Sequence, residues 1–268
     1  MTDQPRYGER APVTPITNAP KARRTPRGPS PIFLGFVAVA LGSGWALWNG
    51  IGPSGIVAFV FVIAVWVISL CLHEFAHALV AYRYGDHSVL YRGYLTLDPL
   101  KYTHVLFSIV LPLLFLILGG IGLPGGAVFI DRSALRTRFA HSAVSAAGPL
   151  TNIAVAIVLA VAFGFREGSS PFWATIAFLL FLQVTAAVLN LLPVPGLDGF
   201  GIIEPYLPRE WLPGAARIAP FAIIGLFALL WIPQVNAAFF SGIIGILTLL
   251  GVPGIMVGSG YNLFQFWG

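Results

Sequence analysis

The feature that most constrains this chain is an apolar run from Gly55 to Tyr82, long enough to cross a lipid bilayer as one helix. In its later half the run carries the sequence HEFAH at residues 73–77, which places three ionisable side chains in a membrane-length segment. Each such side chain costs about 2.5–3.5 kcal/mol or more at the centre of a membrane helix. Side chains kept against that cost indicate a functional site, with a buried polar network or a proton path as the plainer alternative.

Composition indicates a membrane protein. The 268-residue chain is 57% hydrophobic and only 9% charged, whereas soluble domains average about 25% charged residues. We therefore expect an all-α, polytopic protein of the cell membrane. The net charge of +5 does not predict nucleic-acid binding, because the basic residues cluster in the N-terminal tail and the loops, where they report orientation in the bilayer.

Two regions are predicted. Residues 1–30 are rich in proline and arginine and poor in large apolar side chains, so they cannot bury enough surface to fold. We predict a disordered, basic cytoplasmic tail there. The run from Pro31 to about Trp48 is interpreted as an uncleaved signal anchor that keeps the tail in the cytoplasm. Residues 31–268 then form one polytopic membrane domain.

The HEFAH motif has the spacing of a metal site. His73 and His77 are four residues apart, so on one helix face two imidazoles can bind the same tetrahedral Zn²⁺. Glu74 can reach a water at that metal without being a ligand, which suits a general base. A catalytic zinc commonly has a third protein ligand. Asp198 is the candidate, because among the acidic residues it alone directly follows a long apolar helix; an Asp-Gly turn leaving the membrane is the alternative.

Apolar runs and the positive-inside rule together predict a topology. The first two spans cover about 32–49 and 55–82, and the second runs inward, so the histidines lie toward the cytoplasmic side. If Asp198 is to meet them, spans at about 140–165 and 171–192 must run outward and then inward. This requires an even number of crossings between residues 82 and 140. The apolar segment 105–123 is therefore predicted to return to the side it entered, as a re-entrant hairpin over residues 105–130, and spans at about 215–232 and 236–256 complete six crossings.

A short β-containing element is expected beside the site. Residues 89–97 are rich in β-forming side chains and are predicted to form a strand. With the hairpin, this strand gives a re-entrant element over about 89–130. Backbone without helical hydrogen bonds is tolerated at membrane depth only where protein or a wet cavity surrounds it.

Three motifs, in this order along the chain, resemble those of the site-2 protease family of intramembrane zinc metalloproteases. HEFAH lies in an early span, AGPLTN follows at residues 147–152, and NLLPVPGLDG at residues 190–199 ends a later span. The resemblance covers roughly residues 55–200. It implies one Zn²⁺ per chain bound by His73, His77 and Asp198, with Glu74 as general base. It also implies that Asn190 assists the reaction through hydrogen bonding.

The same resemblance implies roles outside the metal ligands. Pro193 would shape the helix break that precedes Asp198. Family members carry a β-element that pairs with an unfolded substrate strand, and residues 89–97 and 126–130 are the candidates here. Tyr94, Leu95 and Thr96 are thus predicted substrate contacts. Asn152 is expected either to form an interhelical hydrogen bond or to position the substrate.

The implied activity is hydrolysis of peptide bonds within or near the transmembrane segments of membrane-anchored proteins, which serves regulated intramembrane proteolysis. The expected partners are such a substrate and the lipid bilayer, and no nucleic acid. The alternative is a metal or proton transporter that uses the same ligands as a transit site. Transporters tend to show repeat symmetry and polar residues on both sides of the midplane, whereas the ionisable groups here stop at one site near one face.

Overall fold

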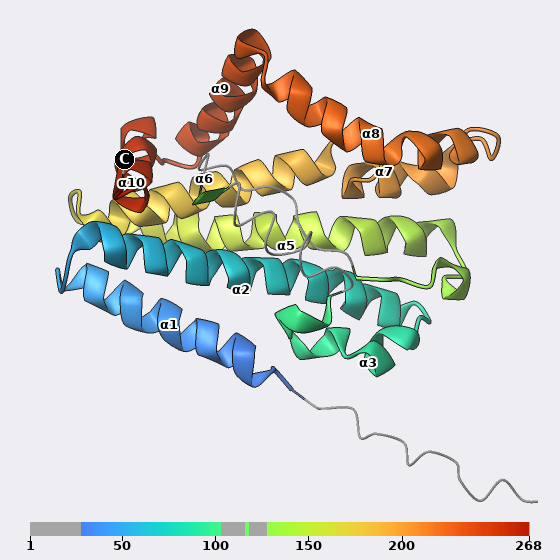
Figure 1. Cartoon of the computed structure of the whole chain (residues 1–268), viewed down its shortest axis with the longest axis horizontal. Coiled ribbons are helices and arrows are strands. Elements are labelled where there is room, and N and C mark those ends of the chain that lie inside the picture. The colour runs from blue at the N-terminus through green and yellow to red at the C-terminus, as the bar shows by residue number, and fades with distance from the viewer. Residues whose placement is uncertain (1–27, 103–115, 118–127, 268) are drawn as a thin grey trace, which may run out of the picture.

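The computed structural model describes residues 28–102, 116–117 and 128–267, so nearly all of the predicted tail lies outside the described residues. Within these ranges the protein is all-α and polytopic, as predicted, and contains no strand. Each long helix of the main bundle runs antiparallel to the one before it (Figure 1). The four are α1 (Pro31–Trp48), α2 (Ser54–Arg83), α5 (Arg138–Gly164) and α6 (Pro171–Leu191).

Local sequence explains where three of these helices begin. Ser30, Thr137 and Ser170 each precede a helix, and their side-chain oxygens accept a hydrogen bond from the backbone N–H three residues later. These bonds satisfy donors that the first helical turn leaves unpaired. Helices α1 and α6 also begin with proline, whose missing N–H has no intrahelical partner to lose at that position.

Helix α6 is the most enclosed element of the bundle. Of its apolar window, 83% is buried inside the molecule, compared with 22% for α1. It packs against α2 and α5 and, on another side, against the C-terminal helices. Because neighbouring helices fix α6 on nearly all sides, its C-terminal end, which leads to Asp198, has a defined position.

The ends of α2 and α5 agree with the predicted topology. Helix α2 ends and α5 begins at the same end of the bundle, on the right in Figure 1. The connection over residues 84–137 therefore leaves and rejoins the bundle at one end, as an even number of crossings requires. The predicted hairpin itself, residues 105–130, lies almost entirely outside the described residues. Of the described pair 116–117, Leu116 is fully buried in the main hydrophobic core.

The predicted strand over residues 89–97 is wrong. Ser88–Arg92 form a short helix, α3, and Tyr94–Thr96 form a 3₁₀ turn, η1, separated by Gly93 at a φ of 77°. Val89 is fully buried and Tyr91 is 80% exposed, although residues two apart would share one face of a strand. No strand in the described ranges is available as a partner, so packing against α2 overrides the β-propensity of these residues.

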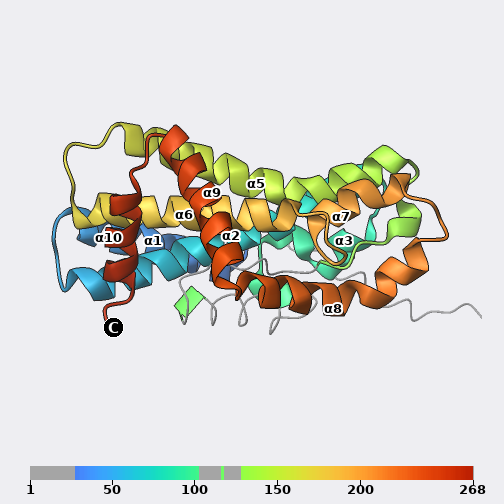
Figure 2. The same cartoon turned by 90° about the horizontal axis from the view of Figure 1, so that it is seen from above.

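The predicted span over residues 236–256 contains a sharp bend. Helix α9 (Pro233–Leu249) and helix α10 (Gly254–Phe264) meet at a bend of 113°. The break contains Gly251, at a φ of 76°, and Pro253, which cannot continue a helix. As a result α10 turns back onto α6 and α2 (Figure 2).

The remaining C-terminal helix and several short elements complete the described chain. Helix α8 (Leu212–Leu230) covers most of the predicted span 215–232 and leads into α9. Considering only described residues, four helices are long and apolar enough to cross a membrane, or up to six if each of two bent pairs is one span. The predicted six crossings lie within that range. The short elements are η2 (Pro99–Lys101), η4 (Arg132–Ala134), α7 (Asp198–Ile203) and η5 (Glu204–Tyr206).

The packing of α10 on α6 gives a first prediction. A Cβ atom on Gly260 would collide with the carbonyl of Ala174 on α6. We expect Gly260→Ala to lower the free energy of unfolding by about 1–3 kcal/mol, because the two helices must separate. The thermal unfolding midpoint in detergent measures this. Gly258→Ala on the same helix, where a Cβ meets nothing within 4 Å, is the matched control and should not lower the midpoint. Equal losses in both variants would contradict the prediction.

Candidate metal centre

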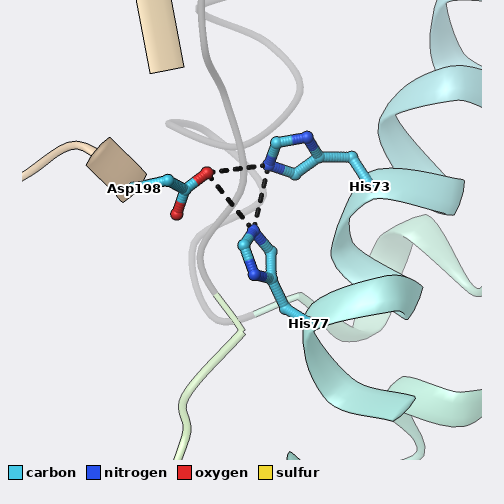
Figure 3. A group of neighbouring side chains, drawn as sticks. All are labelled: His73, His77 and Asp198. Atoms are coloured by element: carbon cyan, nitrogen blue, oxygen red, sulfur yellow. Dashed lines mark hydrogen bonds and ion pairs between the residues drawn. The ribbon is translucent and has the colours of Figure 1, made fainter. Parts of the chain in front are cut away.

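Three predicted residues meet at one point inside the bundle. His73 and His77 lie on successive turns of α2, and Asp198, the first residue of α7, approaches them from the other side (Figure 3). The two histidine Nε2 atoms are 3.1 Å apart, and Oδ2 of Asp198 lies 3.3 Å from Nε2 of His73 and 3.4 Å from Nε2 of His77. Both histidines are buried. In the part of the chain that the structure describes, these three form the group placed to hold a metal ion.

Geometry and chemistry both fit zinc. With Zn–N distances of about 2.0–2.1 Å, the ligand atoms of a tetrahedral site lie roughly 3.3 Å apart. The three observed separations match that edge length. Two imidazole nitrogens and one carboxylate oxygen are a donor set that zinc uses in catalytic sites, with a further position left for water or substrate.

Hydrogen bonds from α5 fix both imidazole rings. Nδ1 of His73 lies 2.6 Å from Oδ1 of Asn152, and Nδ1 of His77 lies 2.7 Å from the backbone carbonyl of Val144. A carbonyl oxygen only accepts, so each Nδ1 carries a proton, and in the neutral ring that a metal ligand requires each Nε2 then presents its lone pair to the centre of the group. This outer arrangement is typical of metal-binding histidines, where it fixes the tautomer and orients the ring.

The chain after α6 brings Asp198 to the histidines. Helix α6 ends at Leu191, and the turn that follows contains Pro193 and Gly196, the latter at a φ of 98°. A Cβ on Gly199 would collide with the carbonyls of Leu191 and Leu192, so α7 can approach the end of α6 this closely only with glycine there. Asp198 therefore points back into the bundle, and the alternative of a simple turn leaving the membrane does not describe its position.

Glu74 lies beside the metal group and outside it. Its side chain is buried, and Oε2 accepts a hydrogen bond of 3.0 Å from the backbone N–H of Val128. Glu74 is not among the three residues placed to hold a metal ion, so its position is compatible with the predicted separation of roles. Val128 belongs to the second predicted β-segment, residues 126–130, of which 128–130 are described and have no regular secondary structure.

Gly148 on α5 allows this site to exist. A Cβ atom at that position would collide with the Nε2 atoms of both His73 and His77. The residue lies midway between Val144 and Asn152 in sequence, and the three are spaced by four, so they share one face of α5. Helix α5 thus approaches the ligand atoms as closely as backbone can, and its flanking turns hold both histidines.

A cavity of about 300 Å³ opens beside Asp198. It is bounded by the turn before Asp198, by α7 and by the small side chains Ala215, Ala216 and Ala219 of α8. Arg132 and Glu204, whose side chains form an ion pair at 3.1 Å, also line it. The metal group is therefore next to a space that peptide or water can occupy.

The other predicted residues have mixed positions. Asn190 is buried in the last turn of α6, and its side chain makes no hydrogen bond to a described residue. Tyr94 and Thr96 are buried, and the carbonyl of Thr96 accepts a hydrogen bond from the N–H of Ser30. Substrate pairing through Tyr94, Leu95 and Thr96 depended on a strand that is absent.

Comparison with known proteins identifies the family. A protein of Mycobacterium tuberculosis with the name "Putative zinc metalloprotease Rip2" is 44% identical over 247 residues, which are 89% of this chain and 94% of that protein. Its namesake in Mycolicibacterium smegmatis is 46% identical over 245 residues, with the same coverage of both chains. This chain belongs to the site-2 protease family. YwhC of Bacillus subtilis, also named as a zinc metalloprotease, is 32% identical over 163 residues, 55% of this chain and 69% of that protein.

Membership makes the chain a metalloprotease, in agreement with the metal group described above. No family model and no solved structure matches the sequence. The identification therefore rests on the relatives.

Several residues of this site-2 protease escaped sequence reasoning. Val144 acts through its backbone carbonyl, which leaves no signal in residue type. Ser69 and Gln183 contact Asn152 from two other helices, and only their polarity inside apolar runs distinguishes them. Gly148 was part of a recognised motif, but its distance to the histidines could not be foreseen from spacing.

Gly148 gives a second prediction. A methyl group there would occupy the place of the ligand atoms, so we expect the zinc content of purified Gly148→Ala to fall from about one ion per chain to roughly a tenth or less. Gly164→Ala at the far end of α5, where a Cβ meets nothing within 4 Å, should keep its zinc. Atomic absorption on both variants measures the difference, and full zinc occupancy in Gly148→Ala would refute the close approach.

Proposed function

We propose that this protein is an intramembrane zinc endopeptidase that hydrolyses peptide bonds within or near the transmembrane segments of membrane-anchored proteins. One observation supports the proposal: His73, Glu74 and His77 lie within α2, a helix long and apolar enough to cross a membrane, and Asp198 meets the two histidines there. His73 is 19 residues from the start of α2 and 10 from its end. At 1.5 Å per residue, these are about 28 Å and 15 Å, so α2 is longer than a hydrocarbon core about 30 Å thick and His73 is more than about 10 Å from either end of the helix.

The chemistry divides between the ion and the chain. A zinc ion held by the three ligands would supply Lewis acidity toward a peptide carbonyl and toward water. Glu74 takes a proton from the attacking water and delivers it to the amine that leaves. Burial and the bond from the Val128 N–H hold its carboxylate in place for that transfer. Asn190, buried beside the break that leads to Asp198, donates its side-chain N–H to the oxyanion that develops on the substrate.

A substrate must lose its helical structure locally before it can react. The peptide bonds of a transmembrane helix are shielded by their own hydrogen bonds and by the absence of water. Residues 128–130 of the predicted β-element have no regular structure, and Val128 contacts Glu74. They are the remaining candidate for contact with the unwound segment of the substrate. Asn152 holds His73 in this structure, and a further contact with the substrate stays a prediction.

We place the protein in the cell membrane with its N-terminus and its active site toward the cytoplasm. Basic residues support this orientation, because the connection between α2 and α5 and the ends next to it carry six of them and meet the bundle near the metal group. The positive-inside rule assigns such short basic connections to the cytoplasmic side. The six are Arg83, Arg92, Lys101, Arg132, Arg136 and Arg138.

Substitution of Glu74 tests the proposal. Purified Glu74→Gln should keep about one zinc ion per chain, since Glu74 is not a ligand, but should lose roughly 10²–10⁴-fold in cleavage rate because the proton acceptor is gone. The assay is cleavage of a single-span membrane substrate in liposomes, with metal analysis of both proteins. Removal of zinc by a chelator should abolish wild-type cleavage, and added zinc should restore it.

The transporter alternative has a different signature. If wild type and Glu74→Gln both bind zinc and neither cleaves a panel of single-span substrates, the protease proposal fails. Uptake of zinc into sealed liposomes by the wild-type protein would then establish transport.

Asn190 gives a separate prediction. We expect Asn190→Ala to lower kcat by about 10²–10³-fold with little change in KM, as observed where one donor to an oxyanion is removed. Asn262→Ala, which changes an exposed asparagine on α10, should leave kcat as it is in the wild type. Unchanged kcat in Asn190→Ala would remove this residue from the mechanism.

A further inference from the structure

A buried polar chain leads from His73 away from the metal group into the bundle. Asn152 on α5 contacts His73 on one side, and on the other its Nδ2 atom donates to Oε1 of Gln183 on α6 at 2.8 Å. The hydroxyl of Ser69 on α2 donates to the same oxygen at 2.8 Å. The side chains of Ser69, Asn152 and Gln183 are buried, and that of Gln183 is fully enclosed. Helices α2, α5 and α6 therefore each contribute one polar side chain on the side of His73 that faces away from the metal group.

The position of His73 in the metal group determines which atom donates and which accepts in the hydrogen bonds from His73 to Asn152 and from Asn152 to Gln183. Nε2 of His73 faces the other ligands with its lone pair, so Nδ1 holds the proton and donates to Oδ1 of Asn152. The amide of Asn152 must then turn its Nδ2 atom, a donor, toward Gln183. Only the oxygen of Gln183 can accept that bond, so the orientation of Gln183 follows from His73 through two steps.

This orientation leaves Gln183 with an unsatisfied group. Its Nε2 atom is buried and has no hydrogen-bond partner among the described residues. A rotated amide would not help, because Nε2 would then face the Nδ2 donor of Asn152. An orphaned buried donor is unfavourable, and native structures keep few of them. The side chain thus holds the orientation that serves His73, although its own Nε2 atom then donates to no described residue.

We propose that Gln183 is a positioning residue for the metal centre. It presents a fixed acceptor to Asn152, which keeps the proton on Nδ1 of His73 and the lone pair of Nε2 on the metal. This inference rests on the zinc site proposed above. Loss of such outer partners typically lowers metal affinity by about 10–100-fold.

Zinc affinity in two variants separates positioning from packing. Gln183→Leu keeps an apolar side chain of similar size but has no acceptor, and we expect its zinc affinity to fall by about 10–100-fold. Gln183→Glu keeps an acceptor oxygen toward Asn152, and its affinity should stay within about threefold of wild type. A residue that merely filled space would give the reverse order, because leucine suits a buried position and a carboxylate does not. Thr185→Val is the matched control. Thr185 is also buried on α6, its hydroxyl makes no hydrogen bond to Ser69, Asn152 or Gln183, and the variant should bind zinc as the wild type does.

The measurement is competition for Zn²⁺ with a chelator of known affinity, on full-length protein in detergent. Binding of Co²⁺ gives a second readout: its visible spectrum should change in Gln183→Leu and be retained in Gln183→Glu. Wild-type affinity in Gln183→Leu, or a loss of more than tenfold in Gln183→Glu, would overturn the inference. If Gln183→Leu does not fold, Gln183→Glu still decides. Failure of the wild type to bind zinc would instead overturn the proposed function.

Discussion

The close approach of α5 to α2 is the contact on which the rest of the site depends. Gly148 brings backbone against the two Nε2 atoms, and one turn to either side Val144 and Asn152 hold the two Nδ1 atoms. A larger residue at 148 would displace the histidines from each other and from their outer partners at once. The same spacing of four residues that places both histidines on one face of α2 places these three on one face of α5. Helices α2 and α5 therefore build most of the site. Asp198 comes from the start of α7, which follows α6.

Much of this arrangement could be predicted because it depends on long-range patterns of simple type. Apolar runs of membrane length give α1, α2, α5 and α6 within a few residues. The spacing of four residues gives the two histidines. The position of Asp198 directly after a long apolar helix makes it a candidate ligand beside the alternative of an Asp-Gly turn, and the family resemblance favours the ligand. The prediction failed where a short segment was assigned by propensity. Residues 89–97 contain β-forming side chains but have no described strand to pair with. The bend at Gly251 and Pro253 within the run over 236–256 was not predicted either.

Other parts of the site could not be predicted, for a physical reason. The partner of His77 is a backbone carbonyl, which every residue possesses, so no residue type marks it. Ser69 and Gln183 are ordinary polar residues whose relation to His73 arises only when three helices pack together. Gly148 illustrates the same limit, because glycine is common in membrane helices for several reasons. Sequence spacing identifies ligands on one helix, whereas the groups that orient them come from neighbours fixed by tertiary packing.

The hydrogen bonds at the Nδ1 atoms of His73 and His77 also affect what can lie between the three ligand atoms. Both Nδ1 protons are directed outward, so two lone pairs and a carboxylate oxygen face one another at 3.1–3.4 Å. Three acceptors at such distances repel unless positive charge lies between them. The three separations differ by only 0.3 Å, which suits one cation at equal distance from all three atoms. The bundle therefore holds three potential ligand atoms at nearly equal separations, an arrangement into which one metal ion fits.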